Sequence, residues 1–203
     1  TCLPNYDVFD EYRYFEPAYE WNILEFKGKR LAVTICEDIW NLGDNPLYRY
    51  CPMDELMKQQ PDLMINLSAS PFDYTHDEDR KATIKSNVTK YKLPMFYCNA
   101  TGSQTEIVFD GASLVFDAAA NLCGQLPMFE EALQSFIVHD DGTIDAPVIE
   151  AAGRMPDKEL EPKALDEHLN IKQVHDALVS GISDYFSKMG FAKAILGSSG
   201  GID

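Results

Sequence analysis

Apolar runs and polar, helix-type segments alternate along most of the chain. Three runs are rich in β-branched or apolar residues and predict buried strands, at 30–36, 62–67 and 94–99. The first run is apolar enough for both of its faces to be buried in a sheet. Between the second and third runs, a segment over 75–92 carries Ile84, Val88 and Tyr91 at helical spacing. This alternation predicts an α/β fold.

Weaker signals predict smaller elements around these. They are an edge strand near 22–26 after an aromatic-rich loop, a turn at Gly28-Lys29, a loop or short helical turn at 37–45, and a short helix at 52–60. Residues 107–109 and 113–117 predict a hairpin across Asp110-Gly111. We expect the last strand of this unit at 134–139.

The composition changes after residue 140, and this change divides the chain. Residues 141–166 are rich in Pro, Gly and acidic side chains, which is typical of a linker. A helix ending at Met189 follows, with Gly190 as its stop signal, and then an apolar strand over 191–196. We therefore expect a first domain at 1–140, a linker at 141–166 and the start of a second α/β domain at 167–203. Because the chain begins at Thr1 and stops within a glycine-rich turn, we expect a segment of a longer protein.

The net charge of −16 narrows the possible partners. So acidic a surface repels phosphate backbones and anionic membranes, so we expect neither nucleic-acid nor membrane binding. The five cysteines form no C-x-x-C pair, which argues against a disulfide framework and a structural zinc site. Free thiols suggest a reducing compartment, and we expect a cytoplasmic protein.

Cys36 is the first candidate for chemistry. It ends a predicted buried strand, where a nucleophile can project from a rigid sheet edge beside backbone N–H groups. The alternative is a buried structural cysteine. Glu37 and Asp38 should raise the pKa of the thiol, so a working nucleophile needs a cation and a base from elsewhere in the fold.

Other polar segments are less specific than Cys36. The small hydroxyl residues of 66–71 could bind a polar substrate or simply cap a turn. The charged run 77–81 and the histidines are expected to be solvated, and no metal site is predicted. The tail 197–203 could wrap phosphate oxygens with backbone N–H groups, or be an expression linker; it lacks the lysine of a P-loop.

Taken together, these motifs resemble the glutamine-dependent NAD⁺ synthetases along essentially the whole chain. Four segments look like the amidase domain of the nitrilase superfamily: L-P-N-Y-D-V-F-D-E-Y-R-Y-F (3–15), C-E-D-I-W (36–40), N-L-S-A-S-P-F (66–72) and E-I-V-F-D-G-A-S (106–113). The segment L-G-S-S-G-G-I-D (196–203) looks like the opening of the pyrophosphatase loop. The resemblance implies an incomplete nitrilase-like α-β-β-α sandwich, then the first helix and strand of a doubly wound ATP-pyrophosphatase domain.

The resemblance also implies a two-site ligase of NAD biosynthesis. Cys36 matches the nucleophile that releases ammonia from glutamine, and ATP with Mg²⁺ activates deamido-NAD⁺ for amidation to NAD⁺. Tyr6 and Ser70 match positions that hold glutamine, and Glu37 and Trp40 lie beside the nucleophile in the same site. The implied ATP site comprises Gly197, Ser198, Ser199, Gly200, Gly201 and Asp203. The resemblance implies a homo-oligomer without a tightly bound cofactor.

The match to the family's catalytic residues is partial. The family's amidase uses Glu, Lys and Cys, of which this chain carries Cys36; the Lys should stand immediately before Thr1 and the Glu well upstream. We therefore expect residues 1–203 alone to be inactive. Two alternatives stay open: a stand-alone nitrilase-type carbon–nitrogen hydrolase, and a non-catalytic binding module with the same fold.

Overall fold

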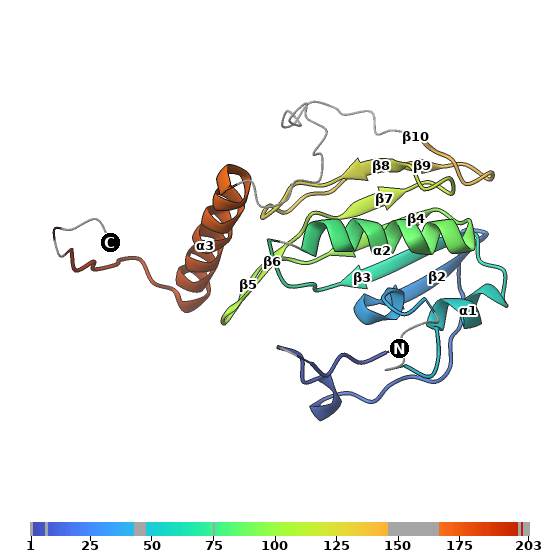
Figure 1. The fold of residues 1–203 in the computed structure, drawn as a ribbon, viewed down its shortest axis with the longest axis horizontal. Coiled ribbons are helices and arrows are strands. Elements are labelled where there is room, and N and C mark those ends of the chain that lie inside the picture. The colour runs from blue at the N-terminus through green and yellow to red at the C-terminus, as the bar shows by residue number, and fades with distance from the viewer. Residues whose placement is uncertain are drawn as a thin grey trace.

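The computed structural model describes residues 2–6, 8–42, 48–74, 76–145, 167–198 and 200, without the side chains of 76, 77 and 167–170. Its main element is a six-stranded sheet in the order β1-β2-β3-β4-β7-β8 (Figure 1). The strands of this sheet are β1 (Leu24–Phe26), β2 (Lys29–Ile35), β3 (Leu63–Ser68), β4 (Met95–Asn99), β7 (Leu114–Phe116) and β8 (Leu122–Gln125). The predicted α/β class and the three main strands are confirmed.

The three central strands β2, β3 and β4 run parallel, so their carboxyl ends meet at one edge of the sheet. β1 joins β2 as an antiparallel edge strand. Lys27 and Gly28 form the connecting turn with φ of 49° and 78°. Two consecutive positive φ values are the requirement of a type I′ hairpin turn, which explains the glycine at position 28.

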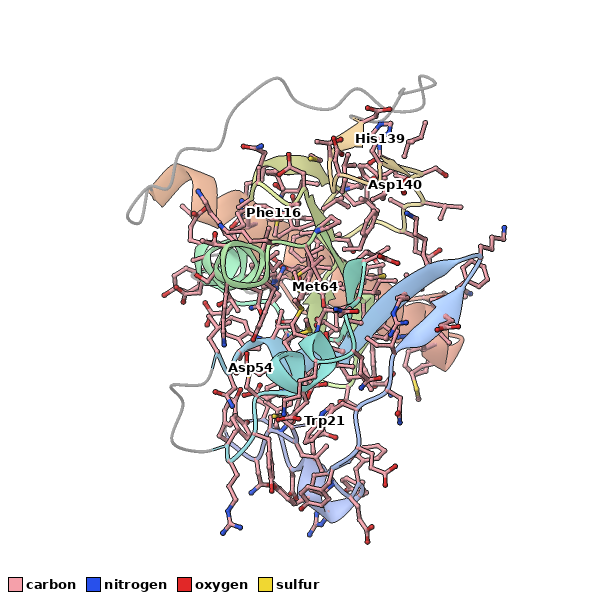
Figure 2. The ribbon with its side chains drawn as sticks, turned by 90° about the vertical axis from the view of Figure 1, so that its right-hand side faces the viewer. Trp21, Asp54, Met64, Phe116, His139 and Asp140 are labelled. Atoms are coloured by element: carbon pink, nitrogen blue, oxygen red, sulfur yellow. The ribbon has the colours of Figure 1, made fainter. Side chains whose placement is uncertain are left out.

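Helices cover one face of the sheet. α2 (His76–Tyr91) crosses this face in Figure 1, and α1 (Pro52–Met57) lies beside β2. Figure 2 places Met64 and Phe116 close to α2, inside the core that the helices and this face enclose. The predicted apolar stripe of α2 is confirmed, because Ile84 and Val88 are fully buried in this core.

The opposite face of the sheet is exposed at the carboxyl ends of its strands. Ile35 is 52% exposed and Leu67 is 48% exposed, although both lie on central strands. The prediction that the 30–36 strand is buried on both faces is therefore wrong for this structure. The physical reason is that described residues cover this face near the amino ends of β2 and β3, where Leu31 is buried, but not near their carboxyl ends.

The hairpin predicted across Asp110-Gly111 is also wrong. β6 (Ile107–Asp110) pairs instead with β5 (Thr101–Gln104), which precedes it. β7 leaves this hairpin and joins β4 and β8 in the main sheet. The reason lies in Asp110, whose side chain turns inward to a buried arginine rather than outward into a hairpin loop.

The end of the first unit differs in detail from its prediction. β8 carries no clear sequence signal and was not predicted. β9 (Ile137–Val138) lies in the predicted last strand, but it pairs with β10 (Ile144–Asp145) in a separate two-stranded sheet. β10 falls within the first residues of the predicted linker, and residues 146–166 lie outside the described residues.

The helix α3 (Glu167–Met189) stands beside the β5–β6 hairpin (Figure 1). The backbone N–H of Ser103 donates to Asp184 Oδ2 at 2.7 Å, and Gly181 approaches Val108 without a side chain to separate them. The predicted strand at 191–196 is not formed. A strand needs a neighbour for its backbone groups, and no described strand lies beside this segment.

Two 3₁₀ turns complete the fold: η1 (Glu11–Arg13) in the N-terminal loop and η2 (Cys36–Ile39) directly after β2. No helix among the described residues combines the length and the apolar character needed to cross a membrane.

Candidate active site

Polar side chains occupy the carboxyl ends of the three parallel strands. Thr34, Asn66 and Tyr97 are direct neighbours in the register of β2, β3 and β4, and each is buried. One step further along, Ser68 lies opposite Asn99, and Cys36 directly follows β2. The carboxyl edge of a parallel sheet is the usual place for a ligand site in α/β proteins.

Cys36 has a strained backbone. Its φ is 37°, in the left-handed region that residues with a side chain rarely adopt. The Asp38 carboxylate holds this turn: Oδ2 accepts from the Ile35 N–H at 2.9 Å and Oδ1 from the Cys2 N–H at 2.6 Å. Burial raises the pKa of Asp38, although these two hydrogen bonds oppose the shift. Asp38 thus stabilises the backbone turn that carries Cys36 at the end of β2.

The pKa of the Cys36 thiol is raised, chiefly because the side chain is buried. The Ser68 hydroxyl and the Ala69 N–H lower this pKa, while Glu37 and Asp38 raise it further. The direction agrees with the sequence-based expectation, but burial contributes more than the neighbouring carboxylates. None of these main influences is a cation, so this surround does not generate a thiolate at neutral pH.

Glu37 is buried beside Cys36 and is held from two sides. The Tyr6 hydroxyl donates to its Oε2 and the Tyr48 hydroxyl to its Oε1, both at 2.8 Å. Burial, and then the contact with Glu37, raise the pKa of both tyrosines. Two of the predicted glutamine-site residues, Tyr6 and Glu37, are therefore in direct contact although they are far apart in sequence.

A turn over Ser68–Ser70 lies against the thiol. Ser68 Oγ donates to Asn66 Oδ1 at 2.6 Å, and Asn66 Nδ2 in turn donates to Thr34 Oγ1 at 3.0 Å. At the other end, the Ser70 N–H donates to Asn99 Oδ1 at 2.9 Å. The chain over Ser68–Ser70 places small polar groups beside Cys36, and both interpretations of its sequence stay predictions.

The bonds from Asn99 continue into a buried ion pair. Asn99 Nδ2 donates to Asp110 Oδ1 at 2.9 Å, and Arg80 Nη1 lies 3.0 Å from Asp110 Oδ2. The side chain of Arg80 is 1% exposed, so the expectation that the whole 77–81 run is solvated is wrong at this residue. The charge is buried because Asp110 reaches it from another element.

Tyr97 lies beneath the same turn. It is 2% exposed, its ring lies 5.8 Å from the Arg80 guanidinium carbon, and its hydroxyl lies close to the side chains of Ser68 and Ser70. Burial raises its pKa, although Arg80, Ser68 and Ser70 lie close enough to lower it, and the Cys36 charge would raise it further. This hydroxyl therefore belongs to the surround of the thiol.

Trp40 ends η2 and packs, half-buried, against the hydrophobic core. Trp40 therefore contacts residues of the hydrophobic core. In the tail, the described residues Gly197, Ser198 and Gly200 are exposed and form no regular element. The other predicted ATP-site residues, Ser199, Gly201 and Asp203, lie outside the described residues.

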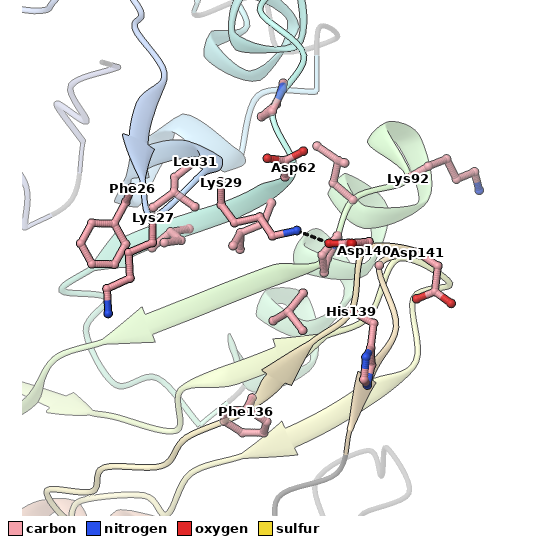
Figure 3. Close-up of a pocket in the computed structure, with 17 residues that line it drawn as sticks. Phe26, Lys27, Lys29, Leu31, Asp62, Lys92, Phe136, His139, Asp140 and Asp141 are labelled. Carbon is pink, nitrogen blue, oxygen red and sulfur yellow. Dashed lines mark hydrogen bonds and ion pairs between the residues drawn. The ribbon is translucent and has the colours of Figure 1, made fainter.

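The cavity shown in Figure 3 has a volume of about 530 Å³, and Cys36 is not among the residues that line it. It is lined by Leu31, Leu63 and Pro94, at the amino ends of the parallel strands, and by the Lys29–Asp140 ion pair. Cys36 lies at the carboxyl ends of the same strands, so the cavity is not the site built here. Among the described residues, no group of three or more His, Cys, Asp or Glu side chains could hold a metal ion.

Sequence reasoning missed several members of the site. Asn66 and Asn99 could have been found, because each is a polar residue at the end of an apolar strand. Tyr48, Tyr97 and Arg80 carry no such signal. Their roles depend on contacts between elements that only the folded chain brings together.

The chain is similar over nearly its whole length to enzymes of one kind. It is 34% identical over 204 residues to the glutamine-dependent NAD(+) synthetase of Synechocystis sp., covering 99% of this chain and 34% of that protein. The synthetase of Thermotoga maritima is 32% identical over 219 residues, covering 99% of this chain and 37% of that protein. The chain thus spans about a third of the length of the curated relatives it matches.

A solved structure gives the same result. The glutamine-dependent NAD+ synthetase from Acinetobacter baumannii, in complex with adenosine diphosphate, superposes with a TM-score of 0.79 at 29% identity. The match covers 98% of this chain and 34% of that chain. A scan against protein-family models gives no match. The resemblance inferred from the motifs and the predicted fold class are confirmed.

Proposed function

We infer that this chain is a section of a glutamine-dependent NAD⁺ synthetase, the kind of enzyme that it resembles over 99% of its length. The whole enzyme would release ammonia from glutamine and use it, with ATP, to amidate deamido-NAD⁺ to NAD⁺. The observation that carries the proposal is Cys36 at the carboxyl edge of the parallel sheet, beside Glu37 and the Ser68–Ser70 turn.

The first proposed reaction takes place at Cys36. Its thiolate sulfur attacks the side-chain carbonyl carbon of glutamine, the carbon–nitrogen bond breaks, and the nitrogen leaves as ammonia after gaining a proton. Water then hydrolyses the thioester, which releases glutamate and restores the thiol. We propose that backbone N–H groups of the turn after β2 stabilise the developing oxyanion.

We propose Tyr6 and Ser70 as the groups that hold the glutamine, and Glu37 and Trp40 as further residues of this pocket. Glu37 is well suited to orient a ligand, because two tyrosine hydroxyls already fix its carboxylate. A fixed carboxylate can receive the amino group of an amino acid without reorganising.

The cation and base for Cys36 are proposed to come from parts of the enzyme outside this chain. The raised pKa of the thiol supports this proposal, because the described surround alone does not favour the thiolate. We therefore propose that residues 1–203 alone turn over no glutamine.

The second proposed reaction uses ATP. We propose a domain boundary within 141–166 and an ATP-phosphate site at Gly197, Ser198, Ser199, Gly200, Gly201 and Asp203. Binding of adenosine diphosphate by the Acinetobacter baumannii synthetase supports a nucleotide site in the whole enzyme. Mg²⁺ would enter this site together with ATP. A cytoplasmic homo-oligomer is part of the same proposal.

A stand-alone carbon–nitrogen hydrolase is not favoured. The similarity to the synthetases extends through α3 and the tail, segments that glutamine hydrolysis at Cys36 does not require. A non-catalytic module is not favoured either, because the cysteine and its polar surround are intact.

The test uses the protein expressed from its complete coding sequence. It is treated with a diazoketone analogue of glutamine, and the adducts are mapped by peptide mass spectrometry. We expect one adduct on Cys36 that excess glutamine blocks. The exposed Cys98 serves as internal control, because any adduct there should be insensitive to glutamine. A Cys36 that stays unmodified, or reacts equally with and without glutamine, would exclude the glutaminase.

A further inference from the structure

A buried chain of hydrogen bonds connects α2 to the turn over Cys36. It begins at Arg80 on α2, passes through Asp110 at the end of β6 and Asn99 at the end of β4, and reaches the Ser70 N–H. All three side chains are buried. The links measure 3.0, 2.9 and 2.9 Å, which are ordinary hydrogen-bond lengths.

The chemistry of the groups allows this chain only one orientation. The Asp110 carboxylate, ionised beside Arg80, can only accept, so the NH₂ group of Asn99 must face it. The carbonyl oxygen of the same amide then faces the Ser70 N–H, which can only donate. Turning the Asn99 amide around would break both bonds at once, so the charge on Asp110 fixes the acceptor offered to Ser70.

The other end of the turn is held independently. Ser68 binds Asn66, and Asn66 Nδ2 also lies 3.5 Å from the Cys36 carbonyl oxygen. The Ser68 carbonyl accepts from the Ala100 N–H at 2.9 Å. With both ends held, Ala69 and its N–H have little freedom to move away from the thiol.

A buried ion pair is a costly way to stabilise a fold, because removing two charges from water offsets much of their attraction. Its placement here suggests a second role. The pair lies one amide away from the turn that carries Ser68 and Ala69, the two groups that favour the Cys36 thiolate. A loosened turn would remove those two contacts together.

We propose that Asn99 is a positioning residue of the glutaminase site: it transmits the orientation of the Arg80–Asp110 ion pair to the Ser68–Ser70 turn and so fixes the groups that face the Cys36 thiol. This inference rests on the proposed function for its role in glutamine turnover. It does not depend on that function for its effect on the thiol.

The experiment compares three variants of the complete protein. Asn99→Leu keeps the size of the side chain and removes both hydrogen bonds, and Asp110→Asn removes the charge that orients the amide. The matched control is Asp117→Asn, since Asp117 is also a buried aspartate at a strand end but holds the β7–β8 turn, through Ala119 and Asn121. Circular dichroism establishes that each variant is folded.

Two readouts separate positioning from stability. The first is the pH profile of Cys36 alkylation by iodoacetamide, and the second is kcat and KM for glutamine. The other ionisable groups facing the thiol are Glu37, Asp38, Tyr6 and Tyr97, and all are unchanged in these variants. We expect Asn99→Leu and Asp110→Asn to shift the alkylation profile to higher pH and to lower kcat/KM by about tenfold or more. Asp117→Asn should match the wild type in both.

The outcomes are distinct. An Asn99→Leu profile equal to that of the wild type would overturn the proposal, as would an equal shift in Asp117→Asn, because it would indicate general loosening. If Asn99→Leu does not fold, Asp110→Asn decides by the same criteria. A wild type without glutamine turnover would refute the proposed function, yet the alkylation profiles would still test the positioning role.

Discussion

The Tyr97 hydroxyl is buried in the sheet, beside Arg80, Ser68 and Ser70. The free energy lost by removing this hydroxyl from water offsets what its contacts contribute, so we expect its removal to be nearly neutral at neutral pH. Its pKa is raised above the ordinary value of 10.0 by burial. The neutral form is therefore favoured in the folded state more than in the unfolded state.

This gives a pH-dependent prediction for Tyr97→Phe. Below pH 10 the tyrosine is neutral in both the folded and the unfolded state, so its ionisation does not change the free energy of unfolding. Above pH 10 the unfolded state loses the proton first, so the free energy of unfolding falls as pH rises. We expect Tyr97→Phe to change the free energy of unfolding at pH 7 by less than about 1 kcal/mol. Above pH 10 the stability of the variant should fall less steeply with pH than that of the wild type. The two slopes should differ by up to about 1.4 kcal/mol per pH unit.

Urea unfolding between about pH 8 and pH 11 measures both effects. The control is Tyr12→Phe at an exposed residue, which should follow the wild-type curve. A Tyr97→Phe curve parallel to wild type above pH 10 would contradict the assigned burial effect.

Single residues differed in how far the sequence could place them. Cys36 was singled out because it ends an apolar strand, where a nucleophile can project from the edge of the sheet. Arg80 was placed on the wrong side of its helix, because it lies in a charged run and its partner Asp110 comes from another element. Sequence alone does not show such a partner.

At the scale of elements, α3 ends with a defined stop. The Phe191 N–H donates to the Phe186 carbonyl at 2.9 Å, the Gly190 N–H to the Ser187 carbonyl at 3.2 Å, and Gly190 has φ of 71°. This is the pattern of a Schellman motif, in which glycine takes the left-handed position. A Cβ at Gly190 would contact nothing within 4 Å, so only the backbone conformation opposes a side chain there.

We therefore expect Gly190→Ala to destabilise the end of α3 by about 1 kcal/mol. Hydrogen exchange of amides in the last helical turn should become about fivefold faster. Gly190→Asn is the matched control, because asparagine tolerates the left-handed region and should lose less. Equal effects of the two substitutions would contradict the assigned cause.

The strands show where element prediction stops. The three parallel strands were predicted because long apolar runs identify them. The 107–117 region was assigned to the wrong hairpin, since Asp110-Gly111 has the composition of a hairpin turn. The pairing of β6 with β5, and of β7 with β4, is decided by contacts between strands rather than by turn composition.

At the scale of the whole molecule, apolar side chains remain exposed on two surfaces. One is the open face of the sheet, with Ile35 and Leu67; the other is α3, where Leu178 is 62% exposed and Ile182 is 60% exposed. Exposed apolar surfaces of this kind mark contacts with further protein.

We expect the isolated polypeptide 1–203 to bind a hydrophobic dye and to associate as its concentration rises. Replacing both Ile35 and Leu67 by serine should reduce dye binding. The control is Leu133→Ser, because Leu133 is 99% exposed but belongs to neither surface. A polypeptide that stays monomeric by light scattering and does not bind the dye would contradict this prediction.

The sequence by itself determined the α/β class, the main strands and helices, Cys36 and the resemblance to the synthetases. These follow from local periodicity and from motifs in which neighbouring residues act together. Only the tertiary structure decided the strand pairing after β4 and the exposure of Ile35 and Leu67 on one face of the sheet. It also decided the hydrogen bonds from Tyr6 and Tyr48 to Glu37 and the hydrogen-bonded chain from Arg80 through Asp110 to Asn99. The reason is physical: hydrogen bonds and burial between elements distant in sequence depend on the folded arrangement, and local composition carries no record of them.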